Sequence, residues 1–368
     1  MQKKIKNIAV TFAFLITLAF LVTMCVVKYF KPTETSESER RPLAQFPEEI
    51  TWDSVVDRTS ITGFEDYSVD QFPFREFFRM VKAKFHLNIL GINENNGLAV
   101  KDDYIAKIEQ DFTPELLDYS IGRLQHVYET LIKDNGGKHF VSIVPDKNYF
   151  LAGEGVLAMD YEKFYSKVYE QTPHLTPVPI TDKLQLADYY RTDTHWKQEE
   201  IIDVAAGLAE SMGVSFANDF TVNTEPTPFY GVYYGQAGLD LPADTISYCT
   251  NDALSNCYVY DYENNKEIPL YNVNALTGRD PYEMFLGGNI SLATIENPDA
   301  LSDKELVVFG DSFSRSLLPL LAGSYSKITL VDIRYMWSAQ VGNYIEFTNQ
   351  DVLFLYSTSV LNNSITLK

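Results

Sequence analysis

The feature that most constrains this chain is an uncharged, almost entirely apolar stretch near its amino terminus, from Ile8 to Val27. A helix rises by about 1.5 Å per residue, so this stretch spans about 30 Å, the hydrocarbon thickness of a bilayer. Lys3, Lys4 and Lys6 precede it, which favours an amino terminus inside the cell. We therefore predict a cytoplasmic stub and one transmembrane anchor over residues 1–31, with the rest of the chain on the extracytoplasmic side of the membrane.

Two alternatives to a retained anchor exist. A cleaved signal peptide needs small residues in an A-x-A arrangement after the apolar run, and Val26, Val27, Lys28 and Tyr29 stand there instead. Cys25 occupies a position where a lipoprotein cysteine would lie, but the bulky Met24 precedes it. A retained anchor is therefore the favoured interpretation, and a lipid anchor is a minor alternative.

The charge balance excludes one class of partner. The chain has 368 residues, with 30 basic and 50 acidic side chains. The first 31 residues hold five lysines and no acid, so the remainder has a net charge of −25. Such a body repels phosphate backbones, and we expect no nucleic-acid partner. Three Cys and five His without ligand spacing predict no metal site.

The soluble part alternates between helical and strand-like patterns. Residues 32–50 are polar and rich in Ser, Glu and Pro, which predicts a tether, and residues 51–368 then form the folded domain. Continuous apolar runs are typical of strands buried on both faces of a parallel sheet. We predict an α/β domain with helices at 116–135, 199–212 and 313–322, and strands at 139–145, 306–310, 327–333 and 351–357.

The segment from about 215 to 285 differs from the rest, because it is rich in Tyr, Gly, Pro and Asn and has little periodicity. We interpret it as loops or an inserted subdomain near the functional site. Cys249 and Cys257 in this segment either close a loop disulfide or remain two free thiols.

The sequence GDSFS, Gly310 to Ser314, follows a predicted strand and precedes a predicted helix. Such a turn places Ser312 at the carboxyl end of a strand and at a helix amino terminus, where backbone N–H groups stabilise an oxyanion. The alternative is an ordinary helix cap made by Asp311 or Ser312.

The sequence TDTHW brings an acid and a base together. Asp193 and His195 are two residues apart, so in extended backbone both side chains project to the same face. The carboxylate then orients the imidazole for base catalysis. A structural histidine is the alternative.

A third motif, MFLGGN from Met284 to Asn289, offers further hydrogen-bond donors to an oxyanion or is a plain turn.

Taken in order, these motifs resemble those of the DHHW family. The proteins of this family are extracytoplasmic, SGNH-hydrolase-like relatives of the alginate O-acetylation proteins of the AlgX and AlgJ type. The resemblance rests on SERRPLAQFP, DQFPFR, VPDKNYF, DTHW, FYGVYYG, FLGGN and GDSFS, and covers nearly all of the chain after the apolar stretch. The chain has Thr194 where the family motif has its first His, a position that is not the base. Only eleven residues follow the last predicted strand, too few for the carbohydrate-binding module of some relatives.

The resemblance implies a three-layer sandwich with a parallel central sheet, in which the Asp-His motif precedes the Ser motif in permuted order. It implies that Ser312 is the nucleophile, His195 the general base and Asp193 its partner. Gly288 or Asn289, with the Ser312 amide, would form the oxyanion hole. Arg334 and Tyr335 would face the same crevice, or form an ordinary surface pair.

The implied activity is transfer of acetyl groups to a secreted or cell-surface polysaccharide through an acetyl-serine, without a cofactor. The acetyl donor would be a membrane-bound O-acyltransferase. Two other functions remain open on the sequence: a carbohydrate acetyl esterase with the same three residues, and a non-catalytic glycan-binding scaffold of an export complex.

Overall fold

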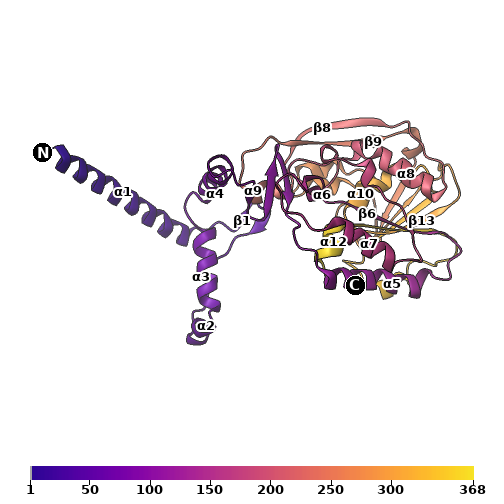
Figure 1. The fold of residues 1–368 in the computed structure, drawn as a ribbon, viewed down its shortest axis with the longest axis horizontal. Coiled ribbons are helices and arrows are strands. Elements are labelled where there is room, and N and C mark those ends of the chain that lie inside the picture. The colour runs from indigo at the N-terminus through magenta and orange to yellow at the C-terminus, as the bar shows by residue number, and fades with distance from the viewer. Residues whose placement is uncertain (1) are drawn as a thin grey trace. The chain divides into compact units, whose positions relative to one another are not determined.

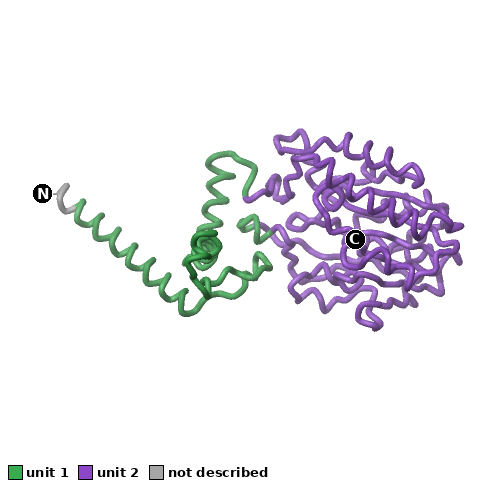
Figure 2. The backbone as a smooth tube through the Cα atoms, turned by 90° about the horizontal axis from the view of Figure 1, so that it is seen from below, with its two compact units in different colours: residues 1–95, 234–240 green, residues 96–233, 241–368 purple. Residues whose placement is uncertain are grey.

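The computed structural model describes residues 2–368 and divides into two compact units (Figure 2). Unit 1 comprises Met1–Asn95 and Tyr234–Asp240, and unit 2 comprises Asn96–Tyr233 and Leu241–Lys368. This division differs from the predicted boundary at residue 51, because three helices that follow that position belong to unit 1. The side chains of Lys3 and Lys4, part of the predicted basic cluster, lie outside the described residues.

Unit 1 begins with the long helix α1, Gln2–Phe30. Residues Lys6–Phe30 of this helix are long and apolar enough to cross a membrane, and they are not buried within the chain. An apolar amino-terminal helix of this kind is typical of a membrane anchor or a signal sequence. The other elements of the unit are β1 (Thr35–Ser36), β2 (Arg41–Pro42), α2 (Trp52–Val56), α3 (Thr59–Asp70), α4 (Arg75–Lys84), the π-helical turn η1 (Phe85–Ile89) and β3 (Glu94–Asn95).

The predicted tether, residues 32–50, is held to the following helices by a cluster of charges. Arg41 forms two hydrogen bonds with the carboxylate of Asp70, at 2.7 and 2.6 Å. Glu39 forms ion pairs with Arg75 at 2.6 Å and with Arg79 at 2.8 Å. Bidentate and partly buried ion pairs of this kind hold the backbone in place. The motifs SERRPLAQFP and DQFPFR therefore form one cluster within unit 1.

Unit 2 is built on an eight-stranded sheet with the order β11-β10-β12-β14-β13-β15-β6-β7. The strands β14, β13, β15, β6 and β7 are parallel, whereas β12, β10 and β11 extend the sheet antiparallel at one edge. These strands are β6 (His139–Val144), β7 (Thr176–Pro177), β10 (Tyr258–Asp261), β11 (Lys266–Ile268), β12 (Leu292–Glu296), β13 (Glu305–Gly310), β14 (Lys327–Val331) and β15 (Asp351–Ser357).

Helices cover both faces of this sheet, which makes three layers (Figure 1). Val308 and Leu353 point to the face covered by α8 (Ile202–Met212) and α10 (Phe313–Leu321). Val307 and Phe354, one residue along each strand, point to the face covered by α5 (Pro114–Val127), α7 (Tyr161–Gln171) and α12 (Thr358–Asn363). The predicted α/β class and three-layer sandwich are confirmed, and burial on both faces explains the continuous apolar runs.

The predicted insertion, residues 215–285, contains regular structure that its composition concealed. A long antiparallel pair, β8 (Thr221–Phe229) and β9 (Asp244–Thr250), forms a separate two-stranded sheet. The strands β10 and β11 of the same segment join the central sheet. The other short elements of unit 2 are β4 (Leu98–Lys101), β5 (Tyr104–Lys107), η2 (Tyr128–Ile132), α6 (Lys147–Leu151), η3 (Thr181–Lys183), η4 (Leu186–Asp188), η5 (Gln198–Glu200), η6 (Asp252–Leu254), η7 (Val273–Thr277), η8 (Pro281–Met284) and α11 (Ser338–Val341), and α9 (Val232–Ala237) spans the division between the units.

Candidate active site

Ser312 lies at the sharp turn between β13 and α10, as its motif predicts. The turn needs Gly310, because a Cβ there would lie 2.1 Å from the hydroxyl oxygen of Ser314 and 2.9 Å from a backbone oxygen of β15. The buried Asp311 carboxylate accepts hydrogen bonds from the backbone N–H groups of Phe313 at 3.1 Å and Ser357 at 2.8 Å. Asp311 therefore fastens the turn to the end of β15, and the Ser312 hydroxyl makes no capping bond.

Asp193 and His195 lie in a loop of bends and not in the extended backbone that we expected. Both the backbone N–H and the ring of His195 bond to the same carboxylate oxygen of Asp193, at 3.0 and 2.6 Å. This local turn replaces the strand geometry, and it still places the two side chains together.

The three predicted side chains form one hydrogen-bonded chain. Nε2 of His195 lies 2.7 Å from Oγ of Ser312, 117 residues further along the sequence, and Nδ1 lies 2.6 Å from Oδ1 of Asp193. Asp193 is fully buried, His195 is almost buried, and Ser312 is partly accessible. This arrangement is that of a nucleophile, a base and an orienting acid.

The motif FYGVYYG supports the buried carboxylate of Asp193 from its other side. The Val232 N–H donates to Oδ2 of Asp193 at 2.9 Å. Gly231 is required for this approach, because a Cβ there would lie 2.3 Å from the Cβ of Asp193. Burial alone would raise the pKa of Asp193, but the charge and hydrogen bond of His195 and the two backbone N–H groups lower it to about 2.

A buried lysine and a second buried carboxylate hold the loop that carries the Asp-His pair. Lys147, from the motif VPDKNYF, donates from Nζ to the backbone oxygens of Tyr190 and Arg191 at 2.9 and 3.1 Å. Asp244 accepts from the N–H groups of Arg191 and Thr192, both at 2.8 Å. Burial lowers the pKa of Lys147 to about 7, although the charges of Asp193 and Asp244 oppose this shift.

Tyr282, which none of the sequence motifs singled out, stacks directly on the His195 ring. The ring centroids are 3.8 Å apart and the planes differ by 6°. The Tyr282 hydroxyl donates to Oγ of Ser316 at 2.8 Å, and the indole N–H of the buried Trp196 donates to the same oxygen at 2.8 Å. Phe313 lies 5.0 Å from the His195 ring. The imidazole is therefore confined between aromatic rings as well as by its two hydrogen bonds.

Three of the four predicted accessory residues, Asn289, Arg334 and Tyr335, belong to one polar network with Arg315, a residue that we did not select. Arg315 lies one helical turn after Ser312, and its Nη1 donates to Oδ1 of Asn289 at 2.9 Å. Its Nη2 lies 3.7 Å from Oδ2 of Asp332, which also accepts from Arg334 at 2.6 Å. The Tyr335 hydroxyl lies 3.5 Å from Oδ1 of Asn289. Helical spacing from Ser312 is the sequence signal that would have found Arg315.

The predicted oxyanion groups differ in whether their N–H donors are free. The Gly288 N–H already points to the backbone oxygen of Phe285 at 3.3 Å, and Gly288 is buried. Asn289 is exposed, and its side-chain N–H groups donate to no residue in the described part of the chain. The Ser312 N–H likewise has no acceptor among residues 2–368. Ser312 and Asn289 therefore offer free donors, and Gly288 does not.

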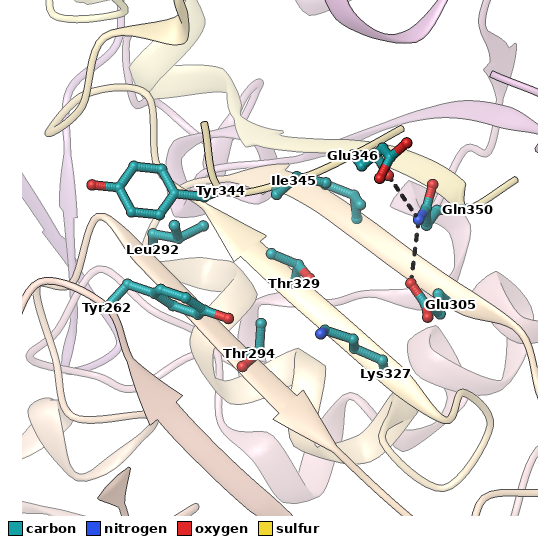
Figure 3. Close-up of a pocket in the computed structure, with 11 residues that line it drawn as sticks. Tyr262, Leu292, Thr294, Glu305, Lys327, Thr329, Tyr344, Ile345, Glu346 and Gln350 are labelled. Carbon is teal, nitrogen blue, oxygen red and sulfur yellow. Dashed lines mark hydrogen bonds between the residues drawn. The ribbon is translucent and has the colours of Figure 1, made fainter. Parts of the chain in front are cut away.

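A pocket of about 170 Å³ lies on one face of the sheet, over β12, β13 and β14 (Figure 3). Its residues include Glu305, at the start of β13, and Lys327, at the start of β14, with Tyr262 and Tyr344 at one side. Gln350 donates to Glu305 at 3.3 Å across it. None of the residues Ser312, His195 and Asp193 lines this pocket.

Two further expectations concern cysteines and metals. Cys249 and Cys257 are both free thiols, and Cys249 is buried. Within residues 2–368 no group of three His, Cys, Asp or Glu side chains has the geometry of a metal site.

Comparison with known proteins supports the fold. No family model matches the chain, and no curated protein matches it. The solved structure of a DHHW family protein from Eubacterium siraeum matches at 20% identity and a TM-score of 0.60, covering 74% of this chain and 94% of that one.

Two structures of PatB1 from Bacillus cereus match as well, each with a TM-score of 0.57. The structure with a sulfonyl adduct is 16% identical and covers 73% of this chain and 98% of that one. The structure without it is 15% identical and covers 74% and 99%. Unit 2 therefore shares the three-layer α/β fold of these structures, and the predicted resemblance to the DHHW family holds at the level of the fold.

Proposed function

We propose that this chain is a membrane-anchored, extracytoplasmic O-acetyltransferase that acetylates a polysaccharide through an acetyl-serine intermediate. The observation that carries the proposal is the continuous hydrogen-bonded chain from Asp193 through His195 to Ser312, with distances of 2.6 and 2.7 Å. The likeness in fold to a DHHW family protein supports it further.

In the first half of the reaction, Oγ of Ser312 attacks the carbonyl carbon of the acetyl donor while its proton passes to Nε2 of His195. The negative charge that develops on the carbonyl oxygen is stabilised by the Ser312 N–H and the Asn289 amide. The Asp193 carboxylate stabilises the imidazolium, which its low pKa allows because it stays ionised. The leaving group takes the proton from His195, and acetyl-Ser312 remains.

In the second half, a sugar hydroxyl gives its proton to Nε2 of His195 and attacks the acetyl carbonyl. The bond to Oγ of Ser312 breaks, and the proton returns to the serine from His195. Trp196 is buried in the core against Phe313, with ring centroids 5.2 Å apart. The Trp196 side chain therefore supports the site from within the core and does not shield it from solvent. Exclusion of water from the acetyl-serine must come from other groups.

The anchor and the donor belong to the same proposal. An extracytoplasmic domain has no access to cytoplasmic acetyl-CoA, so a membrane-bound O-acyltransferase supplies the acetyl group, and α1 keeps the domain beside it. The acceptor is a secreted or cell-surface polysaccharide. The exposed Tyr335 hydroxyl, beside Asn289, and the partly exposed Arg334, which Asp332 holds, provide polar groups that suit a hydroxylated acceptor.

The test uses the full-length chain in detergent with 4-nitrophenyl acetate, with and without an acceptor glycan. Ser312→Ala should reduce the rate of ester cleavage by about 10⁴-fold or more. Ser314→Ala is the matched control, because Ser314 lies on the same helix, is buried, and makes no hydrogen bond through its hydroxyl. Equal rates for wild type and Ser312→Ala would exclude the nucleophile.

The products separate this function from its two rivals. Acetylated glycan at saturating acceptor supports the transferase, whereas free acetate as the main product supports an esterase with the same residues. Unchanged glycan acetylation in cells that express Asp193→Ala, His195→Ala or Ser312→Ala would support a non-catalytic scaffold.

A further inference from the structure

Helix α4 and the turn η1 carry a stripe of exposed aromatic and aliphatic side chains. Phe74, Phe77, Phe78, Val81 and Phe85 follow helical spacing along one face, and each has between 45 and 55% of its surface exposed. Large apolar side chains that line one face of a helix mark a contact surface. We define this set of five residues as the α4 stripe.

The opposite face of α4 is packed within unit 1, so the stripe faces outward. Ala83 is fully buried on that face. Arg79 donates to the backbone oxygen of Gly235 at 2.8 Å and pairs with Glu39 at 2.8 Å. Arg75 also pairs with Glu39, at 2.6 Å. These bonds set the rotation of the helix about its own axis.

The stripe is continuous with the apolar surface of α1. The ring of Phe74 stacks on that of Phe20, with centroids 6.0 Å apart. Phe20 is seven residues from Val27, the end of the uncharged stretch, which corresponds to about 10 Å of helix. The apolar face of an interfacial helix enters a bilayer by about 5–10 Å. A groove between the two helices is lined by Lys28, Phe74 and Phe77, among other residues.

The charge of α4 also differs from that of the chain as a whole. Arg75 and Arg79 are paired with Glu39 and Glu76 and are mostly covered, whereas Lys82 and Lys84 are exposed. The chain has a net charge of −20. Basic residues beside an apolar face are typical of helices that lie at a phospholipid surface, where headgroup phosphates attract them.

We propose that the α4 stripe lies in the interfacial region of the bilayer that α1 crosses, with its rings at the boundary between headgroups and acyl chains. The bilayer is preferred to a protein partner because the stripe adjoins a helix of membrane-spanning length and composition at the depth expected for an interfacial helix. This inference rests on the proposed membrane anchor, and the two fail separately in the experiment below.

The experiment reconstitutes the full-length chain in vesicles of phosphatidylcholine and phosphatidylglycerol, with and without bromine atoms on the acyl chains near the headgroups. Phe77→Trp places a fluorophore in the stripe, and the unsubstituted chain gives the background from Trp52, Trp196 and Trp337. Glu76→Trp is the matched control, because its side chain is 57% exposed on another face of the same helix. Phe20→Trp reports the anchor.

We expect the added emission of Phe77→Trp to be quenched about twofold by the brominated lipids, and that of Glu76→Trp to be quenched much less. Quenching of Phe20→Trp without quenching of Phe77→Trp would overturn the proposal and leave the anchor intact. A Phe77→Cys chain that then cross-links to a second copy would assign the stripe to self-association. Absence of quenching at Phe20→Trp would overturn the anchor and, with it, this inference.

Discussion

The two units of the chain bury apolar residues to very different extents. In unit 2 the sheet strands and the helices on both faces form two large clusters of buried apolar side chains. In unit 1 the buried apolar residues among those described are Leu43, Ala83, Ala237 and Leu239. The unit nevertheless exposes many large apolar side chains, from α1 through α4.

Folding covers the apolar side chains of unit 2 but leaves many of those in unit 1 exposed. Unit 2 removes its apolar surface from water by folding, so its stability comes from its own core. Unit 1 leaves apolar surface uncovered, and its ordered contacts are instead ion pairs such as Arg41 with Asp70. A bilayer around α1 and beside the α4 stripe would cover that surface. Substitutions in the two units should therefore change different properties.

The largest expected effect is on the rate of ester cleavage at the candidate site in unit 2. Asp193→Asn removes the charge that stabilises the imidazolium, and kcat for ester cleavage should fall by about 10⁴-fold. The thermal transition should change much less than the rate. The control is Thr194→Ala, between Asp193 and His195, which should keep kcat within a few-fold of wild type. A kcat for Asp193→Asn near that of the control would contradict the assignment.

The next effect compares the two units directly. Leu208 on α8 is fully buried in unit 2, so Leu208→Ala should lower the free energy of unfolding by about 2–5 kcal/mol. Phe77→Ala in unit 1 should lower it by less than about 0.5 kcal/mol in detergent. Urea unfolding of the solubilised chain, followed by circular dichroism so that both units contribute, measures both. Equal losses would break the comparison.

A third prediction concerns the buried Lys147. Its pKa is about 7 in the folded chain against an ordinary value of 10.5, so between these values the unfolded chain binds a proton that the folded chain does not. The contribution of Lys147 to stability therefore rises with pH across this range, by up to about 1.4 kcal/mol per pH unit. The difference in stability between wild type and Lys147→Met should grow from pH 7 to pH 10. A constant difference would show that Lys147 is protonated throughout.

The smallest effect concerns the ring that stacks on His195. Tyr282→Leu removes the stack and should lower kcat by about tenfold with little change in KM, since aromatic pairs contribute about 0.5–1.5 kcal/mol. Tyr282→Phe keeps the ring and should restore most of the rate. If Phe and Leu at this position give the same loss, the hydroxyl bond to Ser316 matters and the stacking does not.

Local patterns predicted the elements of unit 2 that are regular along the sequence. The helices α5 and α8 follow from apolar spacing, and α8 ends at Gly213 in the left-handed conformation. The parallel strands β13, β14 and β15 follow from apolar runs bounded by turns. The antiparallel strands β10 and β12 were missed. β10 is short, Tyr-rich and partly exposed, and β12 is a buried run of only five residues that also contains Thr294 and Glu296.

The site was predictable where chemistry and chain position coincide, as for Ser312 after a strand and for His195 beside an acid. Tyr282 and Asp244 come from distant segments, and no local sequence pattern predicts that they approach the Asp-His pair. The pairing within residues 193–195 was predicted through extended backbone, whereas a hydrogen-bonded turn produces it. Single-sequence patterns carry local geometry, and contacts between remote segments depend on the tertiary fold.

The most direct test of the central claim is mass spectrometry of the chain quenched during turnover of 4-nitrophenyl acetate. We predict that the peptide containing Ser312 carries one acetyl group in the wild-type chain and none in Ser312→Ala. Continued turnover by a chain whose Ser312 never carries the acetyl group, or retained turnover in Ser312→Ala, would contradict the account.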